Sequence, residues 1–170
     1  MSTAVAPSNP LSARPRNAVV LAGVVAGTLD LVYASTFWGI QVGFTPLQIL
    51  QSIASGWLGH DAAFAGGYPS ALLGLLSHYG IAITMATTFY LAGRRWPALA
   101  HRPFFYGALY GALLYAVMTY VVVPLSNAGA GHQLPAWRWE NLSHIVGHMV
   151  LVGIPCALGA RRAMALRDNR

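Results

Sequence analysis

Six side chains that can exchange protons or ligate a metal fall within or beside long apolar segments of the sequence. They are Asp30, His78, Tyr115, Glu140, His144 and His148. Ionisable groups are costly to place inside a bilayer, so where they occur they tend to mark a functional site. Histidine suits proton exchange because its unperturbed pKa, about 6.5, lies in the physiological range. The set predicts a polar, proton-binding cluster within a membrane.

The spacing of these residues predicts which way they face. Glu140, His144 and His148 repeat at four-residue intervals, so on a helix they share one face. Asp30 shares a helical face with small residues, which let a neighbouring helix approach closely. Those residues are Gly23, Gly27 and Ala34. We therefore expect Asp30 to face the interior of a helical bundle, because a carboxyl in lipid would cost ~3 kcal/mol or more.

Other interpretations of the same residues stay open. Asp30 could be a protonated acid that serves packing only, and each histidine could be an interhelical hydrogen-bonding group. His144 and His148 form a His-x-x-x-His pair that could bind a metal with Glu140, and His78 is a further candidate ligand. His78 and His148 could ligate a haem if they face each other. Absence of a cofactor is the favoured reading.

An enzyme is the least favoured class. The sequence has no Gly-rich phosphate loop, nucleophile elbow or Cys-x-x-Cys motif, and no nucleophile and base can be paired from it. The competing function classes are a proton-linked membrane protein, a metal- or haem-binding redox protein, and an accessory subunit without chemistry of its own.

The composition indicates that the cluster belongs to an integral membrane protein. Hydrophobic residues make up 56% of the chain and charged residues only 8%, whereas a soluble domain has about 25% charged residues. Four apolar runs reach the ~20 residues that a spanning helix needs. We predict transmembrane helices at about 18–40, 70–93, 103–124 and 140–162, forming a four-helix bundle over 18–163. Residues 1–17 are expected to be a disordered tail and 164–170 a basic tail.

The arginines predict the orientation. All ten basic residues are arginines, and nine lie at the end of the helices where both termini would be. Only Arg138 lies in a loop on the other side. This asymmetry follows the positive-inside rule and predicts cytoplasmic termini. The net charge of +6 is therefore explained by topology, and we expect lipid rather than nucleic acid as the partner.

Depth along the helices predicts that the polar residues lie in the outer half of the membrane. Counted from the cytoplasmic arginines of each helix, Asp30, Tyr115 and His148 lie at roughly 20 Å on the helical rise. His78 and His144 lie at about 25 Å. We therefore expect an outward-facing cluster to which all four helices contribute.

The first outer loop carries a helix signal of its own. Thr45, Pro46 and Gln48 form the pattern of a capping box with proline at the first helical position. We predict a short amphipathic interfacial helix at 46–57. Its expected apolar face includes Leu50 and Trp57. Its expected polar face consists of Gln48, Gln51, Ser52 and Ser55.

Two lines of small residues predict close helix packing. The first helix carries the Gly23–Gly27 line, and the third carries Gly107, Gly111 and Tyr115. Packing within the chain is the favoured role of each line, and a homodimer or a membrane-complex contact is the alternative.

The last predicted span resembles that of the YagU-like bacterial inner-membrane proteins. The resemblance is carried by residues 139–143, continued by Gly147 and His148, with Leu134–Pro135 before them and a double arginine at the helix end. The resemblance also includes His78, the segment 23–27 and Pro124–Leu125. It implies an inner-membrane location and involvement in acid tolerance, without a known catalytic mechanism.

The chain departs from this family at two positions. The family pattern has an acid in place of His144, and Asp30 has no clear counterpart. The resemblance therefore favours His78, Glu140 and His148 over a His144–His148 metal pair or a mechanism centred on Asp30.

The predicted orientation can be tested by labelling a single cysteine at Asp61, in the first outer loop. The sole native cysteine, Cys156, is replaced by alanine. We expect Asp61→Cys to react with a membrane-impermeant thiol reagent added to the outer face. Reaction only after the inner face is opened would contradict the topology.

Overall fold

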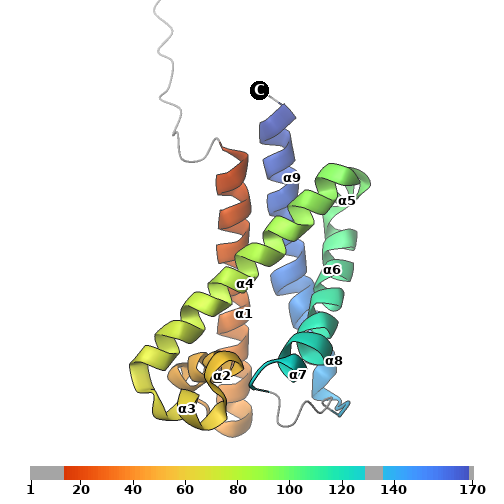
Figure 1. The fold of residues 1–170 in the computed structure, drawn as a ribbon. Helices are drawn as coiled ribbons and strands as arrows, with labels where there is room; N and C mark the ends of the chain where they lie inside the picture. The colour runs from red at the N-terminus through yellow and green to blue at the C-terminus, as the bar shows by residue number, and fades with distance from the viewer. Residues whose placement is uncertain (1–13, 129–135, 169–170) are drawn as a thin grey trace, which may run out of the picture.

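The structure, a computed structural model, describes residues 14–128 and 136–168 and is all-helical in those parts. Within them, four helical stretches are long and apolar enough to cross a membrane: Pro15–Val42, Gly67–Arg95, Pro103–Leu125 and Glu140–Asp168. They pack as a bundle (Figure 1). The prediction of an all-α, four-helix membrane protein is confirmed.

The first stretch is one helix, α1 (Pro15–Val42). Proline occupies its first position, where no backbone N–H is needed. It ends at Gly43, whose φ of 73° is left-handed and whose N–H donates to the Gly39 carbonyl. The predicted 1–17 tail lies mostly outside the described residues, and α1 already includes its last three positions.

Two short helices, α2 (Pro46–Leu58) and α3 (His60–Ala65), follow at the end of the bundle remote from the C-terminus (Figure 1). The capping box is present: Thr45 Oγ1 accepts from the Gln48 N–H at 3.3 Å, and Gln48 Oε1 accepts from the Thr45 N–H at 2.9 Å. The predicted helix at 46–57 is thus confirmed as a helix, whereas α3 was not predicted.

The predicted polar face of α2 is directed toward the protein, and its residues Gln51 and Ser55 are buried. Gln51 Nε2 donates to the carbonyls of Phe64 and Gly67 at 3.2 and 3.3 Å. Those carbonyls lie where α3 ends and the next helix begins, and buried carbonyls at such junctions need a donor. Trp57, predicted to share the apolar face, is 65% exposed, and its Nε1 donates to Ser77 Oγ.

The second long stretch, α4 (Gly67–Arg95), returns across the bundle at a marked tilt (Figure 1). It contacts α1 and α2, and a short turn of helix, α5 (Ala98–His101), connects it to the third stretch. Gly74 lies against the Leu50 carbonyl of α2, so that any side chain at position 74 would collide with backbone.

The third and fourth stretches each contain a π-helical segment. In the third, α6 (Pro103–Val117) continues as η1 (Met118–Val122) and α7 (Val123–Leu125). In the fourth, α8 (Glu140–Gly147) continues as η3 (His148–Gly153) and α9 (Ile154–Asp168). Helix α9 extends into the predicted basic tail at 164–170.

Each π-helical segment ends two residues before a proline. The prolines are Pro124 and Pro155. A proline inside an α-helix lacks an N–H and its ring clashes with the carbonyl four residues earlier. A π-turn changes this register locally, and such turns are common at functional sites. Proline inside two predicted spans was the sequence signal for this irregularity.

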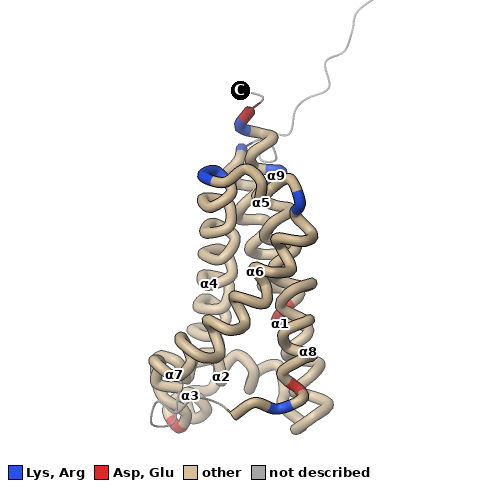
Figure 2. Tube along the Cα trace, turned by 90° about the vertical axis from the view of Figure 1, so that its right-hand side faces the viewer, with Lys and Arg blue, Asp and Glu red and all other residues tan. Residues whose placement is uncertain are grey.

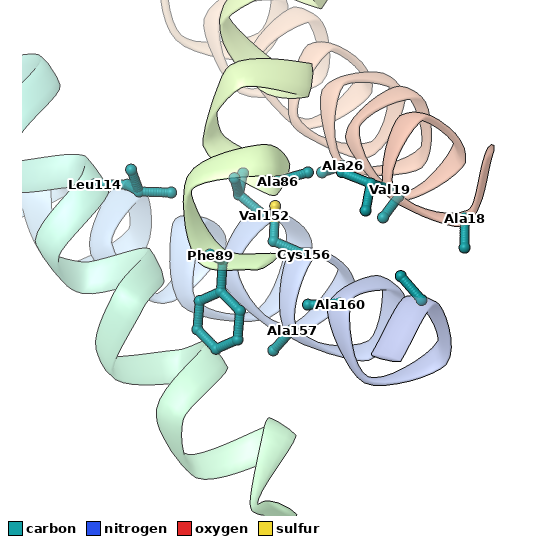
Figure 3. Close-up of a cluster of buried hydrophobic side chains, with 12 residues drawn as sticks. Ala18, Val19, Ala26, Ala86, Phe89, Leu114, Val152, Cys156, Ala157 and Ala160 are labelled. Carbon is teal, nitrogen blue, oxygen red and sulfur yellow. The ribbon is translucent and has the colours of Figure 1, made fainter. Parts of the chain in front are cut away.

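Small side chains form the core. Cys156 is the largest side chain that is fully buried in the described chain, and around it lie mainly alanines of α1, α4 and α9 (Figure 3). Many large apolar residues, among them Leu21, Leu72 and Leu113, are exposed instead. In a membrane protein this arrangement is expected, because lipid solvates large side chains while small ones let helix backbones meet.

Both small-residue lines pack within the chain. Gly23 and Gly27 lie against Ile83 and Tyr79 of α4. Gly111 lies against the His148 carbonyl and Gly107 against the Gly153 carbonyl, so α6 meets η3 backbone to backbone. A homodimer through these two faces would require the bundle to open.

We predict that Gly111→Ala destabilises the protein. A Cβ at this position would lie 2.5 Å from Met149 Cα and overlap the His148 carbonyl, so α6 must shift away from η3. Overpacking of this kind costs about 1–3 kcal/mol, and we expect a lower Tm of the detergent-solubilised protein. Gly80→Ala is the control, since a Cβ there has no described atom within 4 Å other than its chain neighbours and the backbone of its own helix. Equal Tm changes in the two variants would contradict the prediction.

Candidate functional site

Two adjoining cavities lie between the helices, and each of the six predicted residues lines at least one of them. The α4 cavity, of about 230 Å³, is lined by Asp30, His78 and His148, among others. The α8 cavity, of about 660 Å³, is lined by Asp30, Tyr115, Glu140, His144 and His148, among others. Asp30 and His148 line both. The structure therefore places these two side chains between the cavities.

Asp30 and His148 form an acid–histidine pair inside the bundle. His148 Nδ1 lies 4.0 Å from Asp30 Oδ1, and both side chains are about one-fifth exposed, at 19% and 22%. This distance is too long for a hydrogen bond, but it is short enough for a strong electrostatic interaction where water is scarce. No other described residue makes a hydrogen bond or ion pair with the Asp30 carboxyl.

The tautomer of His148 follows from its hydrogen bond. His148 Nδ1 lies 3.0 Å from the backbone carbonyl of His144. A carbonyl oxygen only accepts, so Nδ1 must carry the proton and donate it. The lone pair of neutral His148 is then on Nε2. The Tyr115 ring meets the His148 ring edge to face, with centroids 5.5 Å apart.

His144 is enclosed by aromatic rings. The Phe37 centroid lies 4.5 Å from that of His144, and Trp38 stacks on the imidazole at 5.6 Å. Tyr33 and Tyr115 lie at 5.8 and 6.5 Å. The aromatic residues come from α1 and α6, and all four line the α8 cavity.

A one-way series of hydrogen bonds fixes the tautomer of His144. Ser143 Oγ donates to the Glu140 carbonyl at 2.7 Å, and Tyr33 Oη donates to Ser143 Oγ at 3.2 Å. The Tyr33 hydroxyl then has no proton left, so at 3.3 Å it accepts from His144 Nδ1. His144 and His148 therefore both carry their neutral-state proton on Nδ1.

His78 lies apart from the two other histidines. Its Nε2 donates to the Gly27 carbonyl at 2.7 Å and links α4 to α1. It lines the α4 cavity and not the α8 cavity. The structure thus brings together Asp30, His144, His148 and Tyr115, with His78 on the far side of Asp30.

The metal site proposed from the sequence lacks a complete ligand set in the described residues. Within residues 14–128 and 136–168, no three His, Cys, Asp or Glu side chains lie close enough to hold one ion. Glu140, the third ligand proposed from the sequence, lies instead against Arg138, with Arg138 Nε 3.3 Å from Glu140 Oε2. This pair lies beside the α8 cavity, at the end of the bundle opposite the other described arginines (Figure 2).

Helix α2 covers one side of the site. Ile49, Ser52 and Ile53 line the α4 cavity. Asn127 donates to the carbonyls of Gly56 and Trp57, and so ties the end of α2 to the segment after α7. The position of the short predicted helix over the bundle is therefore set by hydrogen bonds as well as by apolar contact.

Three residues of the site were not found from the sequence: Tyr33, Phe37 and Trp38. Tyr33 and Phe37 follow Asp30 at three- and four-residue steps, which places them on the same side of α1. That spacing was the available signal.

The fold and the site define a multi-pass helical membrane protein with four candidate spans and a polar interior. No protein-family model matches the sequence, and no curated protein and no solved structure matches it. The resemblance to the YagU-like proteins stays a prediction. Two of its positions, Leu134 and Pro135, lie outside the described residues.

The hydrogen-bond series around His144 gives a spectroscopic prediction. Tyr33→Phe keeps the ring but removes the hydroxyl that accepts from Nδ1, so neutral His144 should become a mixture of tautomers. Imidazole ¹⁵N shifts of histidine-labelled protein at pH 8 report this change. Tyr110→Phe is the matched control, because the Tyr110 hydroxyl donates to the Met85 carbonyl, away from any histidine ring contact. An unchanged His144 spectrum in Tyr33→Phe would contradict the proposed direction of the series.

Proposed function

We propose that this chain is a bacterial inner-membrane protein that binds protons from the outer side at an intramembrane Asp30–His148–His144 cluster. The proton-linked role is an acid response or the handling of a small solute. The observation that carries the proposal is the Asp30–His148 pair, 4.0 Å apart and shared by both cavities. Protonation of His148 would create an ion pair with Asp30 inside the bundle.

The arginine distribution supports the proposed orientation. Eight described arginines lie toward the end of the bundle where α1 begins and α9 ends, and Arg138 lies at the other end (Figure 2). By the positive-inside rule the first end is cytoplasmic. The α8 cavity, which reaches Arg138 and Glu140, would then face the outer side. The resemblance to YagU-like proteins supports the inner membrane as the location and acid tolerance as the context.

The arrangement of hydrogen bonds leaves each histidine of the cluster able to bind a proton. A neutral imidazole that donates through one ring nitrogen keeps a lone pair on the other, and this holds for His78 as well, which donates to Gly27. His144 and His148 bond through Nδ1 within their own helix or to α1, and each keeps the Nε2 lone pair for a proton. Both side chains line a cavity large enough to hold water.

The test uses His148→Asn, because the asparagine amide can donate to the His144 carbonyl as Nδ1 does but does not titrate. We expect the variant to be folded and inserted, with a Tm close to that of the native protein. We expect cells that depend on it to lose the survival advantage in acidic medium that the native protein confers. His101→Asn, on α5 at the opposite end, is the matched control and should retain full survival.

The same variants separate function from packing. In the native protein in lipid nanodiscs, ¹⁵N imidazole signals report whether His144 and His148 take up a proton when the medium is acidified. A His148→Asn protein that keeps full acid survival would refute the proposal. A loss of survival that follows the loss of folded protein would assign His148 to structure alone.

A further inference from the structure

The charges around the α8 cavity do not balance. Glu140 is paired with Arg138 at 3.3 Å, whereas no described side chain donates a hydrogen bond to Asp30. With neutral histidines and an ionised Asp30, the cavity carries two carboxylates and one guanidinium, an excess of one negative charge. Each protonated histidine reduces that excess by one unit.

Aromatic rings line much of the cavity, beside the uncharged polar side chains of Gln41, Thr119 and Asn141. Tyr33, Phe37, Trp38 and Tyr115 all line it, and their ring faces attract cations. The other described elements at the cavity, α2, η1 and α7, contribute Ile53, Met118, Thr119 and Val123, none of which titrates. Its titratable and charged groups are Asp30, Tyr33, Tyr115, Arg138, Glu140, His144 and His148. His78 of α4 shares the adjoining α4 cavity with Asp30 and His148.

The cavity has the size of a small-molecule site. Its volume of about 660 Å³ falls within the range of about 300–1,000 Å³ usual for ligand pockets. An anionic ligand would meet the unpaired carboxylate of Asp30, and a neutral polar one would leave that charge without a partner. A cation with apolar substituents would satisfy Asp30 and contact the ring faces together.

We infer that the α8 cavity binds an organic cation, a quaternary or protonated amine with apolar substituents, in competition with protons on His144 and His148. This inference rests on the proposed proton-binding function and gives its solute a chemical class. The Asp30 carboxylate stabilises the bound cation while the histidines are neutral. When His148, 4.0 Å from Asp30, is protonated, the imidazolium takes the place of the cation as partner of the carboxylate.

The inference is tested with benzyltrimethylammonium, by calorimetric titration of the full-length protein in lipid nanodiscs. A proton on His148 takes the Asp30 carboxylate from the cation, so apparent binding should weaken about tenfold or more from pH 8 to pH 5, as it does when the charged partner is removed. Benzenesulfonate, similar in size and opposite in charge, should not bind at either pH. Equal binding of the two probes, or no binding of the cation at pH 8, overturns the inference.

Two variants locate the site. Asp30→Asn should weaken cation binding about tenfold or more, because it removes the charged partner. Trp38→Leu should weaken it by about three- to thirtyfold, the usual range of a cation–π contact. Trp96→Leu, an exposed residue that lines neither cavity, is the matched control. Native affinity in both site variants would overturn the assignment.

Failure of this inference is distinguishable from failure of the proposed function. If His144 and His148 take up protons but the cation does not bind, the proposed proton-binding function is retained and the inference of an organic cation is refuted. If the cation binds with the same affinity at pH 5 and pH 8, the competition with protons is refuted.

Discussion

The backbone contact between α6 and η3 is the constraint on which the polar site depends. Gly107 and Gly111 bring α6 against Gly153 and the His148 carbonyl with no side chain between them. This contact fixes the depth and rotation of η3, and therefore the position of the His148 ring opposite Asp30. Tyr115, one turn beyond Gly111 on α6, is placed against the same ring by the same contact. Because lipid is as apolar as the side chains, the hydrophobic effect does not drive such helices together. Close packing must therefore supply the free energy of helix association.

Much of the fold could be read from the sequence because membrane insertion imposes simple rules. Each sequence signal follows from one requirement of insertion into a membrane, and this holds for span length, the arginine asymmetry and the small residues around Asp30. The structure agrees with the four predicted spans and with the inward direction of the small-residue face. The capping box was equally legible, since it is local. The orientation of α2 could not be predicted in the same way. It depends on hydrogen bonds from Gln51 to carbonyls of α3 and α4, and no local sequence pattern reveals those contacts.

The site was predictable in its members and not in its arrangement. Counting residues along each helix put His78 and His144 at one depth, yet they line different cavities. Depth along a helix fixes one coordinate, whereas rotation and tilt fix the others. The π-helical segments before Pro124 and Pro155 change that rotation within a span. The aromatic enclosure of His144 combines α1 and α6 and follows from the tertiary packing of both.

The direction of the hydrogen bonds at His144 limits what this residue can do with a proton. From Nδ1 the series passes through Tyr33 and Ser143 and stops at the Glu140 carbonyl. A peptide carbonyl is far too weak a base to accept the proton and hand it onward. The series therefore cannot carry a proton beyond the Glu140 carbonyl. Under the proposed function, a proton that reaches Nε2 of His144 would have to leave by the side on which it arrived, so this imidazole would store a proton and not conduct one.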